Sequence, residues 1–546
     1  MTEDPGELVT RARSRQIDGD ITAALELYEG AARLAPQDGH AHFGVGTCAQ
    51  LLGQREKALC AYAASLPTFP DHPAITTRMA HLLRELGRLD EALATYERAR
   101  TLCDDDVTIP VGHSQTLTLL GRNDLALAAL TPGPWDAAGL RLVEVQRAQA
   151  LIGLARFDEA ATVVHDLLDQ GAGDQMVRSI LLSDIAAARW ELEESEQHCA
   201  AACAASPENP TLHLRHAAAL LALLRPAEAI AALTLWAANS PLTPASDVRP
   251  RATQGLLADI ANEMLLRPVA LAAAKRALDD QDVPAAARAV RATPDSLAAA
   301  AALFVTLRRT DLLRRDYVVA ETALLDDDYV HAQLVGRSVI PHHVVQAWLG
   351  SPLPAEVEAL TSTWRRRAGW RYTRLDDRSA MDFLREQVGE AAIRAYRRAR
   401  HPAARADLIR LAWLAANGGV WADVDDACHA PIEPLVDGPT LVLWQEDRGN
   451  LANDFMAAAP GHPAILAARD EAIRSLLNTY TESTWLATGP GLVTRHVAAW
   501  LARHLETIGT TTVILDRHGL KPFVAAGLPM HYKSGPDYWL HRECRG

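Results

Sequence analysis

Positive charge is scarce in this sequence of 546 residues, because 68 acidic side chains outnumber 54 basic ones and leave a formal net charge of −14. Proteins that bind nucleic acid neutralise its phosphates with clustered basic side chains. The charge balance therefore argues against a nucleic-acid partner. Lysine is rare, which we interpret as the codon bias of a GC-rich bacterial genome; it occurs as Lys57, Lys275, Lys521 and Lys533.

Paired cysteines and membrane-spanning runs are also missing. The seven cysteines include no Cys-x-x-Cys pair, so neither a disulfide framework nor a zinc ribbon is indicated. The longest nearly apolar run, Leu297 to Leu307, is about half of the roughly 20 residues that a membrane-spanning helix needs. The first residues lack a basic region followed by an apolar core, so we expect no signal peptide. We expect a cytoplasmic protein without a transmembrane segment.

The composition is that of a folded protein with several domains. Hydrophobic residues make up 49% of the chain and charged residues 22%, which gives enough apolar surface to offset the entropy lost on folding. At roughly 100–200 residues per domain, a chain of this length divides into several units.

The first half is a repeat array with a period of 34 residues. The period is marked by glycine four times and continues, after one inserted residue, at other residue types: Gly19, Gly53, Gly87, Gly121, Ala155, Trp190 and Leu224. Five residues after each marker stands a small residue, as two closely approaching helices require: Ala24, Ala58, Ala92, Ala126, Ala160, Ser195 and Ala229. Tyrosines and prolines recur in the same phase, the prolines where helices should end: Tyr28, Tyr62, Tyr96, Pro36, Pro70, Pro207 and Pro241.

This pattern resembles the tetratricopeptide repeat, a helix-turn-helix unit with glycine at the turn and alanine early in the second helix. The resemblance implies an all-α solenoid of about seven repeats in a domain of residues 1–241, followed by a helical cap or linker region at residues 242–330. Solenoids of this kind commonly hold a peptide or a partner protein in their groove. A scaffold or dimerisation arm is the alternative, because solenoid stability needs no ligand.

Short apolar runs alternate with helical stretches in residues 331–546, which predicts an α/β sheet. We expect the domain boundary between Asp326 and Gly336. The predicted strands are Val344–Leu349, Trp370–Leu375, Val420–Val424, Thr440–Trp444 and Thr512–Leu515.

The most informative segment of this half starts with a predicted helix from Ala403 to Ala416, which Asn417-Gly418-Gly419 ends. Asp407 and Arg410 are three residues apart and therefore share one face of that helix. The next predicted strand carries Trp421, Asp423 and Asp425 in alternation, so that these three share one face of the sheet.

Ionised carboxylates on a buried strand need a cation or hydrogen-bond donors to compensate them. The hard oxygens of Asp423 and Asp425 suit Mg²⁺ or Mn²⁺, either of which can neutralise a diphosphate. The alternative for Asp-x-Asp taken alone is an acidic turn that faces solvent.

The surroundings of this motif are more specific than the motif itself. Ala-x-x-Asp-x-x-Arg, then Gly-Gly, an aromatic residue, one residue and Asp-x-Asp resembles the glycosyltransferase sugar-binding region containing a DXD motif. That region is found in glycosyltransferase family 32, in yeast initiating mannosyltransferases and in the large clostridial glucosylating toxins. The resemblance implies a GT-A-type glycosyltransferase domain at residues 331–546, transfer with retention of configuration, and metal-dependent departure of a nucleoside diphosphate.

The same resemblance assigns roles to the charged residues. Asp407 and Arg410 would hold hydroxyls of the donor sugar, because a carboxylate accepts hydrogen bonds and a guanidinium donates them in a fork. Trp421 and Asp423 would line the ribose and the sugar, and Asp425 would bind the metal. A helical salt bridge between Asp407 and Arg410 is the alternative for that pair.

Upstream, Ile340-Pro341-His342-His343-Val344-Val345-Gln346-Ala347-Trp348-Leu349-Gly350 resembles the opening of the same family. There the tryptophan at the end of the first strand stacks on the nucleotide base, and the resemblance gives this role to Trp348, with Gln346 also in the donor site. The alternative for Trp348 is a place in the hydrophobic core.

Two further stretches resemble the family downstream. Asn453 lies in Leu451-Ala452-Asn453-Asp454-Phe455-Met456, and the resemblance adds it to the donor site. His531 precedes Trp539, where the family often has a histidine followed by Ser-Trp that completes the metal and phosphate site. His531 is therefore a third candidate metal ligand beside Asp423 and Asp425, with a surface histidine as the alternative.

Together these patterns predict a metal-dependent glycosyltransferase that moves a hexose from a UDP- or GDP-sugar to an acceptor recruited by the repeats. The solenoid favours a protein or peptide acceptor. A glycan or lipid-linked saccharide acceptor, with repeats used only for assembly, is one alternative. A non-catalytic adaptor with a relic transferase domain is another, although the intact Asp407, Arg410, Asp423 and Asp425 argue against it.

Overall fold

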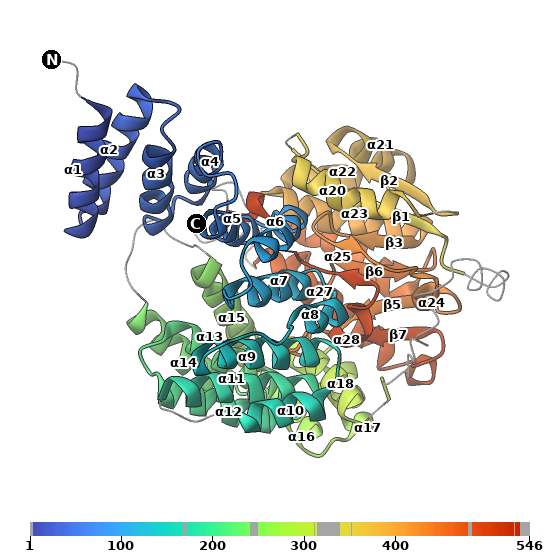
Figure 1. Ribbon diagram of the computed structural model, residues 1–546. Coiled ribbons are helices and arrows are strands. Elements are labelled where there is room, and N and C mark those ends of the chain that lie inside the picture. Colours follow the sequence, from blue (N-terminus) through green and yellow to red (C-terminus); the bar gives the residue numbers. More distant parts are fainter. Residues whose placement is uncertain are drawn as a thin grey trace. The chain divides into compact units, whose positions relative to one another are not determined.

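The computed structural model describes residues 4–167, 172–240, 249–310, 312–313, 339–350, 352–367, 369–478, 483–528 and 530–534 (Figure 1). The chain forms two compact units, one of Met1–Val163 with Pro529–Lys533 and one of Val164–Leu528 with Ser534–Gly546. The predicted domain ends at residues 241 and 330, and the predicted boundary between Asp326 and Gly336, lie outside the described residues.

The first unit is built of helices that follow one another in helix-turn-helix pairs. They are α1 (Pro5–Ile17), α2 (Ile21–Leu34), α3 (Gly39–Leu51), α4 (Arg55–Ser65), α5 (Pro73–Glu85), α6 (Leu89–Leu102), α7 (Thr108–Leu119), α8 (Asn123–Ala129) and α9 (Ala137–Gly153). Helix α10 (Phe157–Asp166) crosses the division between the two units.

Each repeat marker lies in the turn between two helices and has a left-handed backbone. At Gly19, for example, φ is 82°, and its N–H donates to the carbonyl of Gln16 at 3.2 Å, which caps the preceding helix. The markers that are not glycine adopt the same conformation, with φ of 57° at Ala155, 62° at Trp190 and 56° at Leu224. A residue with a Cβ pays a steric penalty there, so the stacked helix pairs impose the turn.

The small residues five positions after the markers are all buried, which confirms the expected close approach of paired helices. The tyrosines of the first repeats fill space that glycines leave open: a Cβ on Gly44 would lie 2.4 Å from the ring of Tyr28. The expected all-α repeat array resembling tetratricopeptide repeats is therefore confirmed.

The second unit continues the helix pairs before its sheet begins. Its helices are α11 (Ala172–Ala188), α12 (Leu192–Ala205), α13 (Pro210–Ala222), α14 (Pro226–Asn239), α15 (Arg249–Leu265), α16 (Pro268–Asp279), α17 (Val283–Ala292) and α18 (Leu297–Arg309). Gln281, between α16 and α17, has φ of 51° and is followed five residues later by the fully buried Ala286. This is a further repeat marker, which the 34-residue phase did not identify because 57 residues separate it from Leu224.

A six-stranded sheet forms the other half of the second unit, with the strand order β2-β1-β3-β6-β5-β7. Its strands are β1 (His343–Ala347), β2 (Arg371–Leu375), β3 (Gly419–Ala422), β5 (Leu441–Trp444), β6 (Phe455–Ala458) and β7 (Thr512–Leu515). The pairs β1–β2, β1–β3 and β5–β7 are parallel, whereas β6 runs antiparallel to both β3 and β5.

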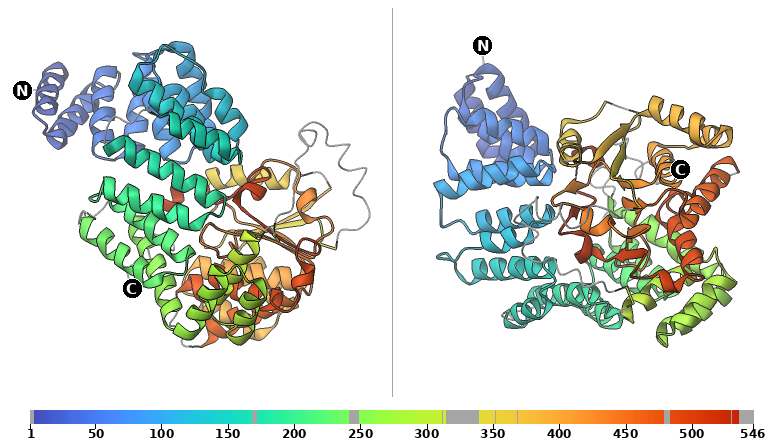
Figure 2. Two further views of the ribbon diagram at one scale, coloured as in Figure 1. Left: turned by 90° about the horizontal axis from the view of Figure 1, so that it is seen from below. Right: turned by 90° about the vertical axis from the view of Figure 1, so that its right-hand side faces the viewer.

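Helices cover one face of this sheet and a mixed layer covers the other (Figure 2). The helical layer consists of α17 and α18 with α21 (Asp377–Gln387), α22 (Glu390–Arg398), α23 (Pro402–Asn417), α25 (Pro463–Leu477) and α27 (Pro490–Leu501). The other layer consists of α20 (Ala355–Arg365), α24 (Glu433–Val436) and the two-stranded sheet of β4 (Ala427–Cys428) and β8 (Val524–Ala525). The remaining short elements are α26 (Thr484–Ala487), η2 (Leu505–Thr507), α28 (Arg517–Leu520) and η3 (His531–Ser534).

The nearly apolar run from Leu297 to Leu307 forms most of α18 and is buried within the second unit. Across the described ranges, no helix is both long enough and apolar enough to cross a lipid bilayer.

The expected fold class, an all-α repeat array followed by a GT-A-type α/β domain, is confirmed. One detail of the predicted sheet is wrong: β3 ends at Ala422, so Asp423 and Asp425 do not alternate along a strand face. The reason is a tight turn directly after β3, in which Asp426 N–H donates to the carbonyl of Asp423 at 3.1 Å and the Asp426 Oδ2 accepts from Asp423 N–H at 3.1 Å.

Candidate active site

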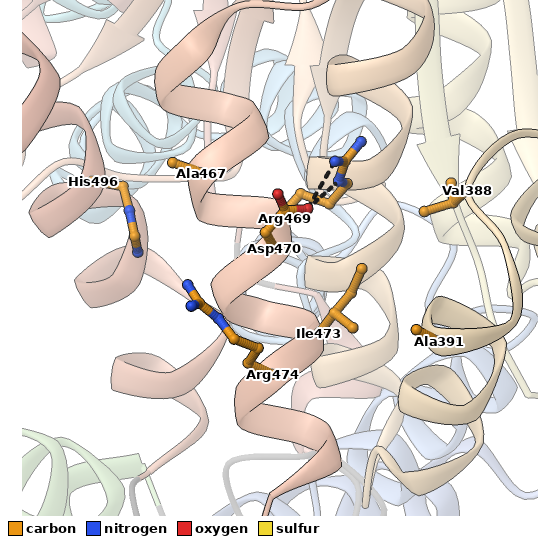
Figure 3. A pocket seen from close by; sticks show the side chains of 8 residues that line it. All are labelled: Val388, Ala391, Ala467, Arg469, Asp470, Ile473, Arg474 and His496. Atoms are coloured by element: carbon orange, nitrogen blue, oxygen red, sulfur yellow. Dashed lines mark hydrogen bonds and ion pairs between the residues drawn. The ribbon is translucent and has the colours of Figure 1, made fainter.

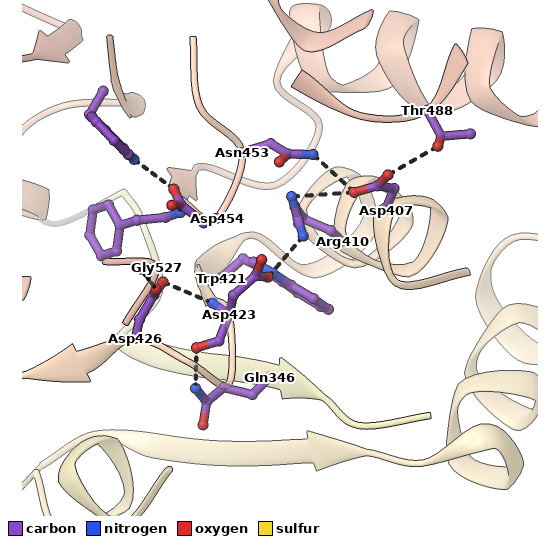
Figure 4. A network of polar contacts seen from close by, with 12 residues as sticks. Gln346, Asp407, Arg410, Trp421, Asp423, Asp426, Asn453, Asp454, Thr488 and Gly527 are labelled. Carbon is purple, nitrogen blue, oxygen red and sulfur yellow. Dashed lines mark hydrogen bonds and ion pairs between the residues drawn. The ribbon is translucent and has the colours of Figure 1, made fainter. Parts of the chain in front are cut away.

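Polar side chains gather where β3 ends, beside the carboxyl end of β1 and the first residue of β6 (Figure 4). Ala422 pairs with Phe455 across β3 and β6, so the residues next to this pair, Asp423 and Asp454, are neighbours. Asp423 N–H donates to the carbonyl of Asp454 at 3.0 Å. The carboxyl ends of parallel strands are the usual place for ligands in α/β sheets.

Arg410 connects α23 to the end of β3. Its Nη2 donates to Asp423 Oδ1 at 2.8 Å, and its Nη1 lies 3.4 Å from Asp407 Oδ1. The guanidinium lies 5.3 Å from the ring centroid of Trp421, whose indole N–H donates to the same Asp423 oxygen at 2.8 Å. The structure thus brings together four residues that the sequence selected. Within the described chain, the buried Nε of Arg410 has no hydrogen-bond acceptor.

Asp407 is almost enclosed, and both of its carboxylate oxygens are engaged. Oδ1 accepts from Asn453 Nδ2 and Oδ2 accepts from the Thr488 hydroxyl, each at 3.0 Å. Asp407 therefore fixes Asn453 and Arg410 in place. The predicted direct contact between Asp407 and hydroxyls of a sugar stays a prediction.

Residues 423–426 form an acidic turn after β3, and two side chains hold this turn through its backbone carbonyls. Gln346 on β1 is fully buried and donates to the carbonyl of Asp423 at 2.9 Å, while it accepts from the Tyr372 hydroxyl at 2.9 Å. The indole N–H of Trp364 donates to the carbonyl of Asp426 at 2.9 Å. Gln346 thus supports the acidic turn, and a contact between Gln346 and a donor stays a prediction.

Asp426 ties this turn to the segment after β8. The side chain is fully buried, and its Oδ1 accepts from Gly527 N–H at 2.7 Å. Leu528 N–H donates to the carbonyl of Asp425 at 3.0 Å. The turn is consequently fixed by strands β1 and β6, by α20 and by the chain beyond β8.

The electrostatics of the site are dominated by crowded carboxylates. Limited access to water raises the pKa of Asp423, and the charges of Asp425 and Asp454 raise it further, whereas Arg410 lowers it. The pKa of Asp426 is raised well above its usual value by burial and by the same acidic neighbours. Burial likewise raises the pKa of Asp454. Arg410 therefore compensates only part of the negative charge that gathers here.

This excess of carboxylate oxygen suits a divalent cation. Magnesium is commonly held by one or two carboxylates together with phosphate oxygens of a substrate, and Asp423 and Asp425 could supply such a pair. In the part of the chain that the structure describes, no group of three His, Cys, Asp or Glu side chains is placed to hold a metal ion. A metal ion held by Asp423 and Asp425 would therefore need phosphate oxygens of a substrate or water to complete its shell.

Three other predicted site residues have different outcomes. Trp348 follows β1 and is half-buried, and its backbone N–H donates to the carbonyl of Leu375 at 2.9 Å. Asn453 is buried and reaches Asp407. His531 begins η3, but its side chain lies outside what the structure describes, as do Tyr538 and Trp539. A role of His531 in metal binding stays a prediction.

A separate hollow of about 560 Å³ lies among α22, α25 and α27 (Figure 3). It is lined by Val388, Ala391, Ala467, Arg469, Asp470, Ile473, Arg474 and His496. Its arginines are paired with acids, Arg469 with Asp470 at 2.7 Å and Arg474 with Glu471 at 2.6 Å. None of the predicted site residues lines it.

Sequence reasoning missed Asp426, Asp454 and Thr488 as members of the site. Asp426 directly follows Asp-x-Asp, so a third adjacent carboxylate was a signal that could have been used. Asp454 is next to the predicted Asn453, and Thr488 is the first residue of Thr488-Gly489-Pro490. Asp454 contacts Asp423 and Thr488 contacts Asp407, 31 and 81 residues away in sequence, so only the fold reveals these contacts.

Residues 354–442 match the sequence model of the family described as "Glycosyltransferase sugar-binding region containing DXD motif". The matched range contains α23, the Gly-Gly turn, β3 and the acidic turn. The predicted resemblance to this family is confirmed.

Two curated yeast proteins show where related sequences occur. Inositol phosphoceramide mannosyltransferase 1 of Schizosaccharomyces pombe is 23% identical over 190 residues, which cover 34% of this chain and 59% of that protein. Mannosyl phosphorylinositol ceramide synthase SUR1 of Saccharomyces cerevisiae is 31% identical over 99 residues, 18% of this chain and 25% of that protein. The chain spans less than two thirds of the length of either relative.

Among solved structures, a tetratricopeptide repeat protein from Parabacteroides merdae is similar over 47% of this chain and 98% of its own. The sequence identity is 14% and the TM-score is 0.41.

Proposed function

Because residues 354–442 match a DXD-containing sugar-binding region of glycosyltransferases, we propose that this protein is a metal-dependent glycosyltransferase. It moves a hexose from a UDP- or GDP-sugar to an acceptor, with retention of configuration. The observation that carries the proposal is Arg410, held between Asp407 and Asp423 beside an acidic turn. A guanidinium and carboxylates in this arrangement can bind the hydroxyls of a sugar.

The residues divide into those that contact the donor and those that position them. The Arg410 Nε has no acceptor in the described chain and is the donor group we assign to a sugar oxygen. Asp423 lines the sugar and ribose, and Trp348 stacks on the base at the end of β1. Asp407 and Gln346 position these groups through Asn453 and through the Asp423 carbonyl.

A bound Mg²⁺ or Mn²⁺ supplies positive charge that neutralises the departing diphosphate. Asp425 and Asp423 would hold it. Gln346, Trp364 and Asp426 keep the acidic turn fixed, so that its carboxylates need no reorganisation when the substrate binds.

Two acceptor classes follow from different observations. The helical repeats favour a protein or peptide, because solenoids of this kind commonly present a groove to a polypeptide. The names of the yeast relatives favour an inositol phosphate head group and mannose as the transferred sugar. The repeats would serve assembly alone in the second case.

The test is a panel of nucleotide sugars, including UDP-glucose, UDP-galactose and GDP-mannose, incubated with the full-length protein and Mn²⁺. Released nucleoside diphosphate identifies the donor. The active donor, carrying a labelled sugar, is then offered to a polypeptide fraction and to inositol phosphoceramide. Absence of release from every donor, with Mn²⁺ and with Mg²⁺, would favour the non-catalytic adaptor.

A further inference from the structure

Helix α18 belongs both to the helical repeats and to the sheet domain of the second unit. All of its residues except Arg309 are buried. Leu303 and Leu307 lie in one hydrophobic cluster with Leu443 of β5 and Ile514 of β7. Ala301 and Val305, on another side of the helix, lie in the cluster that the repeat helices form. The last helix of the array is therefore packed as a core element of the sheet domain.

Arg308, near the end of α18, fastens this helix to the carboxyl edge of the sheet. The side chain is 5% exposed. Its Nη2 donates to the carbonyl of Ile514 on β7 at 2.8 Å, and its Nε donates to Gln445 Oε1, directly after β5, at 3.3 Å. Nη1 lies 3.8 Å from Asp516, which follows β7. One buried guanidinium thus joins the ends of two strands.

The contact at Gln445 continues into the turn between β5 and β6. Gln445 bridges to Leu451, and its Nε2 donates to the carbonyl of Gly449 at 3.4 Å. Gly449 lies against α18 so closely that a Cβ would be 2.7 Å from Val305 Cγ2. The turn of residues 445–451 therefore rests on α18 at both Arg308 and Val305.

The same turn leads into the acidic site. Ala452 N–H donates to the carbonyl of Trp444 at 3.0 Å, and the Trp444 indole N–H donates to Asp454 Oδ1 at 2.7 Å. The next contacts belong to the site: Asn453 reaches Asp407, and Asp454 accepts from the N–H of Asp423. Hydrogen bonds and the covalent chain between Trp444 and Asp454 together connect α18 to the acidic turn.

We propose that Arg308 is a positioning residue of the transferase site, which holds the 445–451 turn and through it Asn453 and Asp454. The kinetic part of this inference rests on the proposed function, whereas the structural part does not. The helical repeats are accordingly part of the scaffold of the site, because a misplacement of about 1 Å at the reacting groups can reduce turnover roughly 100-fold.

The test compares Arg308→Met with Arg309→Met in the full-length protein. The two arginines are adjacent, but Arg309 pairs with Glu193 on α12 at 3.0 Å and is the one residue of α18 that is not fully buried, with 15% of its side chain exposed. Arg308→Lys keeps the charge with fewer donors and serves if Arg308→Met does not fold. Amide hydrogen exchange is measured in peptides that cover residues 443–455, at a temperature where circular dichroism shows each variant folded.

We expect exchange in these peptides to rise by at least about tenfold in Arg308→Met, less in Arg308→Lys, and not in Arg309→Met. The kcat of nucleotide-sugar hydrolysis falls by about 10- to 100-fold in Arg308→Met, with a smaller change in KM. Unchanged exchange in folded Arg308→Met and Arg308→Lys, or an equal rise in Arg309→Met, overturns the inference. If the wild-type protein hydrolyses no donor, the proposed function fails, and the exchange data alone still decide the role of Arg308.

Discussion

At the scale of single residues, buried polar side chains differ in whether they have partners. Arg410 is nearly inaccessible, yet it is held by Asp407, Asp423 and the Trp421 ring. His462, at the start of α25, is the opposite case. It is 5% exposed and packs on Trp500 at 4.7 Å, but neither ring nitrogen finds a hydrogen-bond partner among the described residues.

His462 should make the protein sensitive to acid. Burial, with a smaller contribution from His504, lowers the pKa of His462 to about 4 in the folded state, against about 6.5 when unfolded. The folded state therefore favours the neutral ring. As the pH falls from 6.5 towards 4, the unfolded state binds a proton at His462 that the folded state does not bind, so the free energy of unfolding decreases over this range. Between pH 7 and pH 5, the wild-type protein should lose about 2 kcal/mol more unfolding free energy than His462→Phe.

Urea unfolding of both proteins at the two pH values measures this difference. The phenyl ring of His462→Phe can keep the packing on Trp500 but cannot bind a proton. The difference between the two proteins therefore measures the effect of protonating His462 on stability. An equal loss of stability in the two proteins would show that His462 is protonated as readily in the folded state as in the unfolded state.

Four of the predicted site residues share a short stretch of chain. Asp407, Arg410, Asp423 and Asp425 fall within 19 residues that form a helix, a Gly-Gly turn, a strand and the acidic turn after it, so their spacing already places them together. Asp454, directly before β6, and Thr488, directly after α26, join the same network only after folding. No local spacing encodes contacts of that kind.

At the scale of elements, the Gly-Gly turn between α23 and β3 sets the place of the acidic turn. Gly418 and Gly419 have φ of 64° and 102°, and they end α23 where the sequence predicted its end. A Cβ on Gly419 would lie 2.6 Å from the carbonyl oxygen of His343 on β1. The end of β3 was not predictable, because it depends on the Asp426 side chain. Strand β6 was missed because Phe455–Ala458 contains no β-branched residue.

Gly419→Ala should destabilise the protein by about 3 kcal/mol or more, since it combines a left-handed backbone with a clash against β1. Gly438→Ala is the matched control. Its φ is 101°, but no atom lies within 4 Å of the added Cβ, so only the backbone strain of about 1–2 kcal/mol is expected. Urea unfolding measures the stability of both variants. An equal loss of unfolding free energy in the two would mean that β1 moves freely to accept the methyl group.

At the scale of the whole molecule, the repeats and the sheet share one core within the second unit. Trp190, Leu214 and Trp236 from the repeat helices lie in the same hydrophobic cluster as Ala301 of α18 and Trp485 of α26. The repeat period could be predicted from the sequence because it recurs locally. The packing of α18 against both the repeat helices and the sheet could not be predicted, because the sequence of an apolar helix does not show which elements bury it.

A chain cut at residue 252 should therefore not fold. It would lose α11 to α14 and expose the apolar side chains that Trp190, Leu214 and Trp236 cover. A chain of residues 172–546 keeps these helices and should unfold cooperatively. Thermal unfolding followed by near-ultraviolet circular dichroism distinguishes the two. A cooperative transition of residues 252–546 at the wild-type temperature would contradict the shared core.

The central claim is that the acidic turn after β3 carries a metal-dependent sugar transfer. The most direct measurement is the rate of nucleotide-sugar turnover in a buffer of defined Mn²⁺ concentration, for the wild-type protein, Asp425→Asn and the control Asp470→Asn. Asp470 is exposed on α25 and pairs with its neighbour Arg469 at 2.7 Å, outside the acidic turn and the 445–451 turn. We predict that turnover vanishes in Asp425→Asn and in wild-type protein treated with EDTA, because an amide brings no negative charge to the cation, while Asp470→Asn keeps its activity. Turnover at the wild-type rate in folded Asp425→Asn, or in metal-free wild-type protein, would contradict the account.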